Sequence, residues 1–461
     1  MNIYDIFMSG RKIMQMEKNL NSPARQLLTA LFDDGAYQEI GSYLKEKNAP
    51  AGVVTAYGYV NGNPVYAFAQ DKSIENGAVG MAHAEKISKL YGLAAKTGAP
   101  VVGIYDSNGA FMDGSAASLN AYSVMMEQTA AVSGVVPQIS IIAGVCAGSA
   151  AVMACAADFV IMSQEAELFF TPNIEQSSAD VCAANGISAL TADSPEAAVA
   201  QARKLINILP VNNMACTPCM EYDMPSVAAG TDFASYVESI ADGESLLEVY
   251  GEYAGAAYTA FATVTGSTVG IVGTNKEIKL TADDCNKIAR FVRTCDAFSV
   301  PVITLIDTLG FEGSQASETA GSVRALTRLA GSYAEATTPK ISVVTGNAVG
   351  AVFVALAGKG CNADFSYAFE NACIAPLLPE AAVEFLWHDK LKDCDNLQEK
   401  RQELEKEYAD TVASAEAAAK IGTVDEIITP ADLRNAVSKS LAMLEGKRVT
   451  NLPKKHNNFP F

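Results

Sequence analysis

The sequence predicts an α/β protein built from two copies of one layered fold. Short runs rich in β-branched residues alternate with stretches of helical periodicity, which is typical of helices packed on a largely parallel sheet. A strand–glycine–helix segment occurs twice, at 137–153 (PQISIIAGVCAGSAAVM) and at 339–356 (PKISVVTGNAVGAVFVAL). A turn of such detail, repeated at long range, indicates a duplicated domain.

Landmarks of the first half reappear in the second half in the same order and at a nearly constant offset. Asp106 and Asp307 are 307 − 106 = 201 positions apart, and Gly148 and Gly350 are 350 − 148 = 202 apart. The other matched pairs are Lys86 with Lys287, Ile87 with Ile288, and Pro100 with Pro301. We place the boundary in the looser region 222–239, which gives expected domains of 1–232 and 233–461.

The first copy begins with a β-hairpin and continues as helix and strand. Residues 53–71 alternate β-branched and aromatic residues around Asn61-Gly62, the commonest tight hairpin turn. Residues 83–98 have the periodicity of a helix, with Ile87, Leu90 and either Leu93 or Ala94 on one face. Residues 100–106 (PVVGIYD) form a buried strand that ends in a polar turn. Residues 241–310 repeat these elements, so each half is expected to carry the same sheet.

Composition excludes several classes of function. The 461 residues are 49% hydrophobic and carry a net charge of −19, which argues against a nucleic-acid or anionic-membrane surface. No apolar run is long enough to span a membrane, and the N-terminus lacks the order of a signal peptide, so we expect a cytoplasmic protein. The ten cysteines, including the pair Cys216 and Cys219, are interpreted as reduced structural residues.

Common catalytic motifs are missing from the sequence. It contains three histidines, His83, His388 and His456, and none accompanies a serine or cysteine nucleophile elbow. It has no P-loop, no GxGxxG after a strand and no constellation of metal ligands. We therefore expect neither a hydrolytic triad nor a bound nucleotide nor a metal.

The repeated turns themselves are suited to holding an anion. A helix start presents backbone N–H groups that have no partner within the helix, and these can stabilise an oxygen that becomes anionic during a reaction. Two such turns without an acid–base set predict a reaction whose protons are handled by substrate or cofactor, such as enolate formation from a thioester. The alternative is that both glycines only allow close packing of helix on strand.

Longer stretches resemble a known family. They are 58–106, the segment VVPQISIIAGVCAG, FVRTCDAFSVPVITLIDTLGF, YAEATTPKISVV and GTVDEIITPADLR. In the same order, from about Ala24 to the C-terminus, the chain resembles the acyl-CoA carboxyltransferase family. These are the biotin-dependent subunits of propionyl-CoA carboxylases, transcarboxylases and sodium-pumping methylmalonyl-CoA or glutaconyl-CoA decarboxylases. The family fold is a pair of tandem crotonase-like β-β-α spiral domains, which would explain the repeat.

The resemblance implies a role for each turn. Backbone amides of the first half would hold the thioester oxygen of the acyl-CoA and its enolate, and those of the second half would hold the ureido oxygen of biotin. The biotin anion left after CO₂ release would remove the α-proton, so no side-chain base is required. The implied catalytic residues are Gly148, Ser149, Ala351 and Val352. The implied acyl-CoA-binding residues are Ser107, Asn108, Gly109, Ala110, Ala147, Gly148 and Ser149, and those for biotin are Gly350, Ala351, Val352 and Val354.

The resemblance also implies partners. The chain has neither a biotin-attachment Met-Lys-Met nor the ATP-binding loops of a biotin carboxylase, so biotin would arrive on a separate carrier protein. A biotin carboxylase or a membrane sodium-pump decarboxylase subunit would complete the assembly, the latter bringing the chain to a membrane. The family places each site between subunits, so a homo-oligomer is expected, either a dimer or a hexamer built as a trimer of dimers. The acyl-CoA and the direction of the reaction stay open.

The chain departs from the family pattern at both turns. Gly-Gly-Ala is replaced by Gly-Ser-Ala after Ala147 and by Gly-Ala-Val after Val349, and an expected arginine after Ala110 is Phe111. A backbone N–H survives these changes, but a Cβ would crowd the ligand wherever the backbone needs φ > 0. Two alternatives to an active carboxyltransferase therefore stay open. One is a catalytically reduced partner subunit of a hetero-oligomeric complex, and the other is a crotonase-type hydratase or isomerase.

Overall fold

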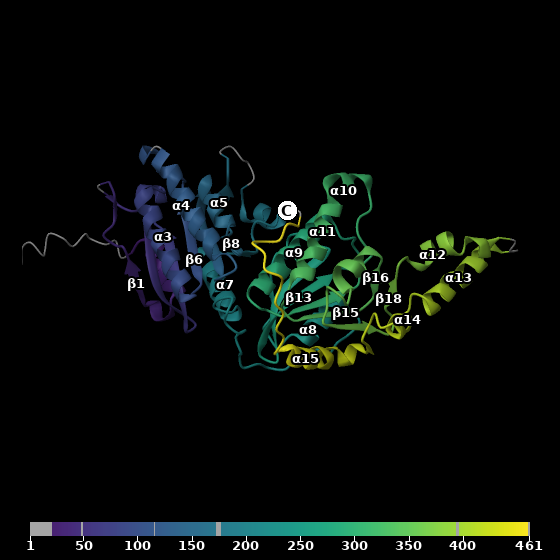
Figure 1. The fold of residues 1–461 in the computed structure, drawn as a ribbon. Helices are drawn as coiled ribbons and strands as arrows, with labels where there is room; N and C mark the ends of the chain where they lie inside the picture. Colours follow the sequence, from purple (N-terminus) through teal and green to yellow (C-terminus); the bar gives the residue numbers. More distant parts are fainter. Residues whose placement is uncertain (1–20, 48, 115, 172–176, 393–395, 460–461) are drawn as a thin grey trace, which may run out of the picture. The chain divides into compact units, whose positions relative to one another are not determined.

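The computed structural model describes residues 21–459, except for 48, 115, 172–176 and 393–395. The chain divides into two compact units, one ending at Asn207 and the other beginning at Ile208 (Figure 1). The segment that follows Ile208 packs on the second unit, since Met220 N donates to Gly266 O at 2.9 Å. The units therefore divide at the end of a helix, before the 232/233 boundary that we proposed from the loose composition of 222–239.

The first unit is built on one mixed sheet, in the order β1-β4-β5-β6-β7-β8-β10, with β9 paired to β7. The pairs β1–β4 and β4–β5 are antiparallel, and the strands from β5 onward pair in parallel. The strands are β1 Tyr37–Ile40, β4 Val53–Val60, β5 Asn63–Gln70, β6 Val101–Ser107, β7 Gln138–Ala147, β8 Phe159–Ser163, β9 Glu167–Phe169 and β10 Leu190–Ala192, beside the small pair β2 Lys45–Glu46 and β3 Ala49–Pro50. The α-helices are α2 Pro23–Leu31, α3 Met81–Thr97, α4 Ala116–Val132, α5 Ser149–Cys155, α6 Ala179–Ala184 and α7 Pro195–Ile208.

The second unit repeats this plan with a sheet in the order β11-β12-β13-β14-β15-β17-β19 and a separate parallel pair, β16–β18. Its strands are β11 Leu247–Glu248, β12 Ala257–Val264, β13 Ser267–Thr274, β14 Val302–Ile306, β15 Lys340–Val344, β16 Asn347–Val349, β17 Phe365–Phe369, β18 Cys373–Ala375 and β19 Glu426–Ile428. Its α-helices are α8 Phe233–Ile240, α9 Ala282–Ala297, α10 Gln315–Ala320, α11 Ser322–Glu335, α12 Pro379–Leu386, α13 Leu397–Thr411, α14 Ala415–Lys420 and α15 Leu433–Leu444.

The predicted hairpin opens each unit. Strands β4 and β5 pair along their full length around Asn61 (φ 50°) and Gly62 (φ 77°). The matching turn of β12 and β13 uses Thr265 (φ 52°) and Gly266 (φ 81°). Both central residues have positive φ, which gives the hairpin the twist of its strands. The prediction from Asn61-Gly62 is confirmed, and a threonine occupies the same strained position in the second copy.

Helices cover the sheets and bury the periodic residues expected from the sequence. In α3, Ile87, Leu90 and Ala94 are buried against the strands. In the second unit, α9 and α11 lie on one side of the central strands, and α8 and α15 lie on the other (Figure 1). Helices thus pack on the sheets, and the loops and turns lie at the carboxyl ends of the strands.

A buried lysine ties the corresponding helix of each unit to its hairpin region. Lys86 Nζ donates to Val53 O, and Lys287 Nζ donates to the carbonyl oxygens of Tyr253 and Ala257 at 2.7 Å each. Burial lowers the pKa of Lys287 to about 8. The repeat seen in the sequence at these lysines therefore reflects a structural role that both units share.

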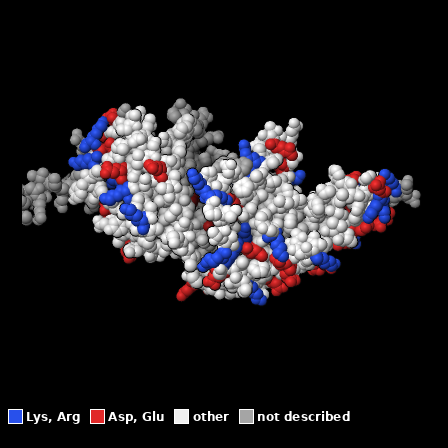
Figure 2. Space-filling model, viewed as in Figure 1, with Lys and Arg blue, Asp and Glu red and all other residues white. Residues whose placement is uncertain are grey.

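The charged segment after residue 387 forms helices on the outside of the second unit, although 393–395 lie outside the described residues. Helices α12 and α13 pair beyond the sheet, and Figure 2 shows acidic and basic side chains gathered on them. Trp387 packs edge-on against Tyr408, with ring centroids 5.5 Å apart, and Arg401 pairs with Glu384 at 2.5 Å. No helix among the described residues is both long and apolar enough to cross a membrane.

The C-terminal segment packs on α11 of its own unit. Lys454 and Asn457 both bond the carboxylate of Glu335, and the ring of Phe459 lies over Gly331, where a Cβ would come within 2.9 Å of it. These contacts hold the described part of the tail against α11 of the second unit.

Candidate active site

The first repeated turn joins β7 to α5 through Gly148. Gly148 has φ 62° and ψ −130°, a conformation that essentially only glycine adopts. Its N–H is already bonded to Phe169 O at 2.9 Å. Among the described residues, the amides of Ser149 and Ala150 have no acceptor, as expected for the first residues of a helix. The donors available at this turn are therefore those that follow Gly148.

The second repeated turn has the same construction. Gly350 has φ 60°, and its N–H donates to Ala375 O at 2.9 Å. Ala351 is exposed, while the side chain of Val352 is only 1% exposed and packs into the unit. The helix continues as a π-helix over Phe353–Ala357, and Val354 is 64% exposed. The amides of Ala351 and Val352 have no acceptor within the described part of the chain.

The loop after β6 lies against the first turn. A Cβ on Gly109 would stand 3.4 Å from Ala147 O, which measures how closely the two segments approach. Ser107 is fully buried, and its Oγ accepts a hydrogen bond from Gly109 N at 3.1 Å, so its hydroxyl shapes the loop. Asn108 is exposed. The structure thus brings the expected acyl-CoA residues of this loop and of the first turn into one cluster.

Ala110 supplies a further backbone donor in this cluster. Val79 N donates to Gly109 O, and Phe111 N donates to Val79 O, both at 2.9 Å, so the parallel bridge at Val79 holds the residues on either side of Ala110. Ala110 N itself has no acceptor among the described residues. An amide on the loop and an amide at the helix start are the two elements of an oxyanion hole.

The second unit contains a matching loop that was missing from the predicted site. Thr308 Oγ1 accepts from Gly310 N at 3.2 Å, and Leu280 N donates to Gly310 O at 2.9 Å. Leu280 bridges Phe311 as Val79 bridges Ala110. The 201-residue offset applied to Ser107, Gly109 and Ala110 would have found these residues, because it already matched Asp106 with Asp307.

The departures from the family pattern leave both turns intact. Positive φ falls on Gly148 and Gly350, whereas Ser149 and Ala351 lie in the helices that follow. A Cβ at the latter two positions therefore requires no unusual backbone. At the position of the missing arginine, the ring of Phe111 packs beneath Lys47, whose Nζ lies 5.1 Å from the ring centroid.

Burial keeps three side chains of the first unit in their neutral forms. Burial, with a further contribution from Lys86, lowers the pKa of His83 to about 3, and burial raises the pKa of the Cys146 thiol well above its usual range. Burial also raises the pKa of the Tyr122 hydroxyl. The described residues contain no group of three or more histidine, cysteine or acidic side chains that could hold a metal. Backbone amides are thus the chemically prominent groups at the turn.

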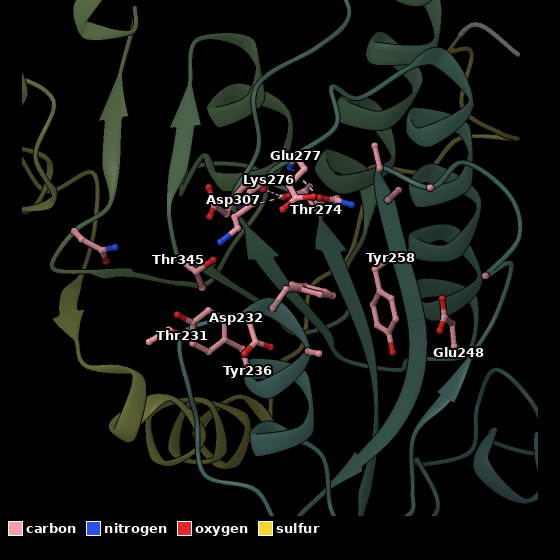
Figure 3. A pocket seen from close by; sticks show the side chains of 18 residues that line it. Thr231, Asp232, Tyr236, Glu248, Tyr258, Thr274, Lys276, Glu277, Asp307 and Thr345 are labelled. Atoms are coloured by element: carbon pink, nitrogen blue, oxygen red, sulfur yellow. Dashed lines mark hydrogen bonds between the residues drawn. The ribbon is translucent and has the colours of Figure 1, made fainter.

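A separate cavity of about 510 Å³ lies at the carboxyl ends of strands β13, β14 and β15. Figure 3 shows Lys276, Asp307 and Thr345 close together on one side of the cavity, with Tyr258 and Glu248 on another. Residues 350–354 do not line it. Asp307 connects the two places, because its Oδ1 accepts a hydrogen bond from Asn347 N at 2.9 Å, three residues before Gly350.

Comparison with solved structures identifies the class of protein. Transcarboxylase 12S, solved as a hexamer assembly with hydrolysed methylmalonyl-coenzyme A bound, matches with a TM-score of 0.92 and 31% identity, covering 99% of this chain and 98% of that one. The expectation of tandem crotonase-like domains in an α/β fold is therefore confirmed.

Sequence comparison then defines the family. The sequence family described as the carboxyl transferase domain matches residues 21–459, and the chain belongs to that family. The propionyl-CoA carboxylase beta chain of Cereibacter sphaeroides is 32% identical over 492 residues, covering 98% of this chain and 96% of its own. The methylmalonyl-CoA decarboxylase subunit alpha of Propionigenium modestum is 33% identical over 497 residues, with the same coverage. The resemblance inferred from sequence motifs is confirmed.

Proposed function

We propose that this chain is the carboxyltransferase subunit that moves a carboxyl group between carboxybiotin on a carrier protein and an acyl-CoA of the propionyl-CoA/methylmalonyl-CoA type. The observation that supports this most directly is the pair of matched turns, each with amides after a positive-φ glycine that have no acceptor in the described part of the chain. Whole-length likeness to propionyl-CoA carboxylase beta and methylmalonyl-CoA decarboxylase alpha chains supports the same substrate class.

In this proposal the first turn binds the thioester. Ser149 N and Ala110 N would donate to the thioester oxygen, and their hydrogen bonds would strengthen as charge develops on the enolate oxygen. Preorganised backbone donors need no reorientation during the reaction, and removing one such donor typically costs about 10²–10³ in kcat. The bond of Gly148 N to Phe169 O would hold Ser149 in place, and the bridge to Val79 would hold Ala110.

The second turn would hold biotin. The residues present fit a neutral ureido group, because Ala351 is exposed and the amides of Ala351 and Val352 have no acceptor among the described residues. When bound, biotin supplies the carboxyl group and the base. The amides of Ala351 and Val352 would donate to the ureido oxygen, Gly350 would hold them in place through its bond to Ala375 O, and the exposed Val354 would lie beside the ring.

The same proposal includes partners. Biotin would be presented by a separate carrier protein, and a biotin carboxylase or a membrane decarboxylase subunit would complete the assembly. Because a solved relative is a hexamer assembly, we propose that this chain also forms a homo-oligomer. No metal is included in this reaction scheme.

The test is a carboxyl-transfer assay with the purified chain. The enzyme is incubated with methylmalonyl-CoA labelled in its free carboxyl group and with biocytin as acceptor, and labelled carboxybiocytin is measured. Propionyl-CoA and glutaconyl-CoA serve as competitors that rank acyl groups. We expect acceptor-dependent transfer.

Two results would separate the alternatives. Binding of acyl-CoA without any transfer would favour a catalytically reduced partner subunit. Hydration or isomerisation of an unsaturated acyl-CoA without transfer would favour a crotonase-type enzyme instead.

A further inference from the structure

One aspartate in each unit sits where a strand leaves its regular path toward the turn. Strands β6 and β7 pair regularly up to Tyr105 opposite Ile142, and pairing resumes only at Ser107 opposite Cys146. Asp106 therefore faces a three-residue excursion of β7, residues 143–145. An excursion of this kind re-aims the chain that follows it.

The carboxylate of Asp106 fills that excursion. Its Oδ1 accepts a hydrogen bond from Val145 N at 3.2 Å, three residues before Gly148. Gly144 lies directly on the carboxylate, since a Cβ there would come within 2.4 Å of Asp106 Oδ1. An amide displaced from its ladder thus regains an acceptor from a side chain rather than from the neighbouring strand.

The second unit repeats this arrangement. Strand β15 ends at Val344 opposite Ile306, and the amides of Thr345 and Gly346 both donate to Ile306 O, at 2.9 and 3.2 Å. The chain resumes at Asn347, whose N–H donates to Asp307 Oδ1 at 2.9 Å. A Cβ on Gly346 would again collide with this carboxylate, at 2.2 Å from Oδ1.

We propose that Asp106 and Asp307 are positioning residues, each holding the strand excursion that aims its own glycine turn. Neither belongs to the expected set of binding or catalytic residues, and each acts through the backbone three residues before a turn. This inference rests on the proposed function for its activity readout. Displacing a donor by about 1 Å from a reacting oxygen can lower the rate about 10²-fold. Losing the aspartate's hydrogen bond to the backbone is therefore expected to have a measurable effect on the rate.

The test compares Asp106→Ala with Asp106→Asn. Asparagine keeps an oxygen that can accept from Val145 N, whereas alanine leaves that amide without a partner. Hydrogen–deuterium exchange of peptides covering 143–155 should speed up about tenfold or more in Asp106→Ala and stay close to wild type in Asp106→Asn. Asp106→Ala should lower kcat/KM for the acyl-CoA by about 10–100-fold, with KM for biocytin within about twofold of wild type.

Substitution of Asp307 is expected to affect the use of biocytin and not the use of the acyl-CoA. Asp307→Ala should speed exchange over 345–357, raise KM for biocytin about tenfold and leave KM for the acyl-CoA within about twofold, with Asp307→Asn again close to wild type. Lys72→Met is the control, because Lys72 Nζ lies 3.3 Å from Asp106 Oδ1 and its loss removes the ion pair while the contact to Val145 remains. Lys72→Met should change neither exchange nor kinetics.

Several outcomes would overturn the proposal. Unchanged exchange in Asp106→Ala would show that the carboxylate does not hold the excursion. Faster exchange with unchanged kinetics would show that the excursion does not aim the turn. If Asp106→Ala fails to fold, Asp106→Ser replaces it, since a serine hydroxyl is too short to reach Val145 N. A wild-type protein inactive in carboxyl transfer would refute the proposed function alone, because the exchange measurements need no activity.

Discussion

The two units keep the same backbone at their turns and differ in the side chains around them. In both, a positive-φ glycine donates to a neighbouring strand, a hydroxyl caps the facing loop and an aspartate accepts from the chain before the turn. At the position of His83 in the first helix, the second unit has Asp284, which forms a capping box with Thr281. The features shared by both copies are those that fix where backbone amides point.

The cavities beside Asp106 and Asp307, unlike the turns, differ between the two units. Asp106 is paired with Lys72 and borders a cavity of about 110 Å³. Asp307 borders the cavity of about 510 Å³, and Lys276 forms no ion pair with it among the described residues, although it lines the same space. The duplication has therefore preserved the geometry of the turns while the volume next to them has diverged.

The largest expected effect comes from removing one amide at a turn without disturbing its glycine. Ser149→Pro deletes the first helical N–H at a position where proline is well tolerated, and we expect kcat to fall by about 10²–10³-fold. Ala351→Pro is the equivalent change in the second unit and should mainly impair use of biocytin. Ser149→Ala and Ala351→Ser keep the amides and serve as controls in steady-state assays. If either proline raised KM equally for the acyl-CoA and for biocytin, the assignment of one substrate to each turn would be contradicted.

Substituting the glycines themselves tests backbone strain. Gly148→Ala forces a Cβ into a positive-φ residue with open space around it, so we expect a loss of about 1–3 kcal/mol in unfolding free energy from strain alone. Gly350→Ala should cost more, because its Cβ would also stand 3.2 Å from Pro376 O. The control is Gly92→Ala, inside α3 with open space around it, which should stabilise by about 0.5–1 kcal/mol. Urea unfolding measures all three, and a neutral Gly148→Ala would contradict the assigned φ.

His83 predicts an acid sensitivity that belongs to the first unit. Its pKa is lowered to about 3 in the fold, so the unfolded chain binds an extra proton as pH falls below about 6.5. Stability should therefore drop between about pH 6.5 and pH 3, by at most about 1.4 kcal/mol per pH unit. His83→Gln should flatten this dependence in thermal unfolding, while His388→Gln, at an exposed histidine, should not. Identical pH profiles for wild type and His83→Gln would argue against a buried neutral histidine.

Local sequence signals predicted much of the fold. Asn61-Gly62 specified a hairpin because both positions need positive φ. The spacing of Ile87 and Leu90 with Leu93 or Ala94 predicted one face of a helix, and the structure buries Ala94 there. The internal offset then transferred the plan to the second unit. These signals act over a few residues, so they can be read without knowing how distant segments meet.

The features of the site that could not be predicted depend on contacts between segments far apart in the sequence. Nothing in the sequence around Gly148 shows that its amide donates to Phe169 O, more than twenty residues later. The amides without an acceptor among the described residues are therefore those of Ser149 and Ala150. The use of Asp106 as an acceptor likewise depends on a break in strand pairing. The loop at Thr308 and Phe311 was predictable, because the offset of 201 residues that matches Asp106 with Asp307 also matches Ser107 with Thr308 and Ala110 with Phe311.

Backbone donors at both turns have a consequence for how mutations map onto activity. In the proposed function the reactive groups are peptide N–H bonds, which are present with almost any side chain attached, since only proline removes them. Replacing Ser149 by alanine would therefore record tolerance at a position that the proposal places in the oxyanion site, and Ala351 is already alanine. Proline at Ser149 or Ala351 would reveal the donor, whereas proline at Ala151 or Val354 would remove an amide that already donates to Gly148 O or Gly350 O.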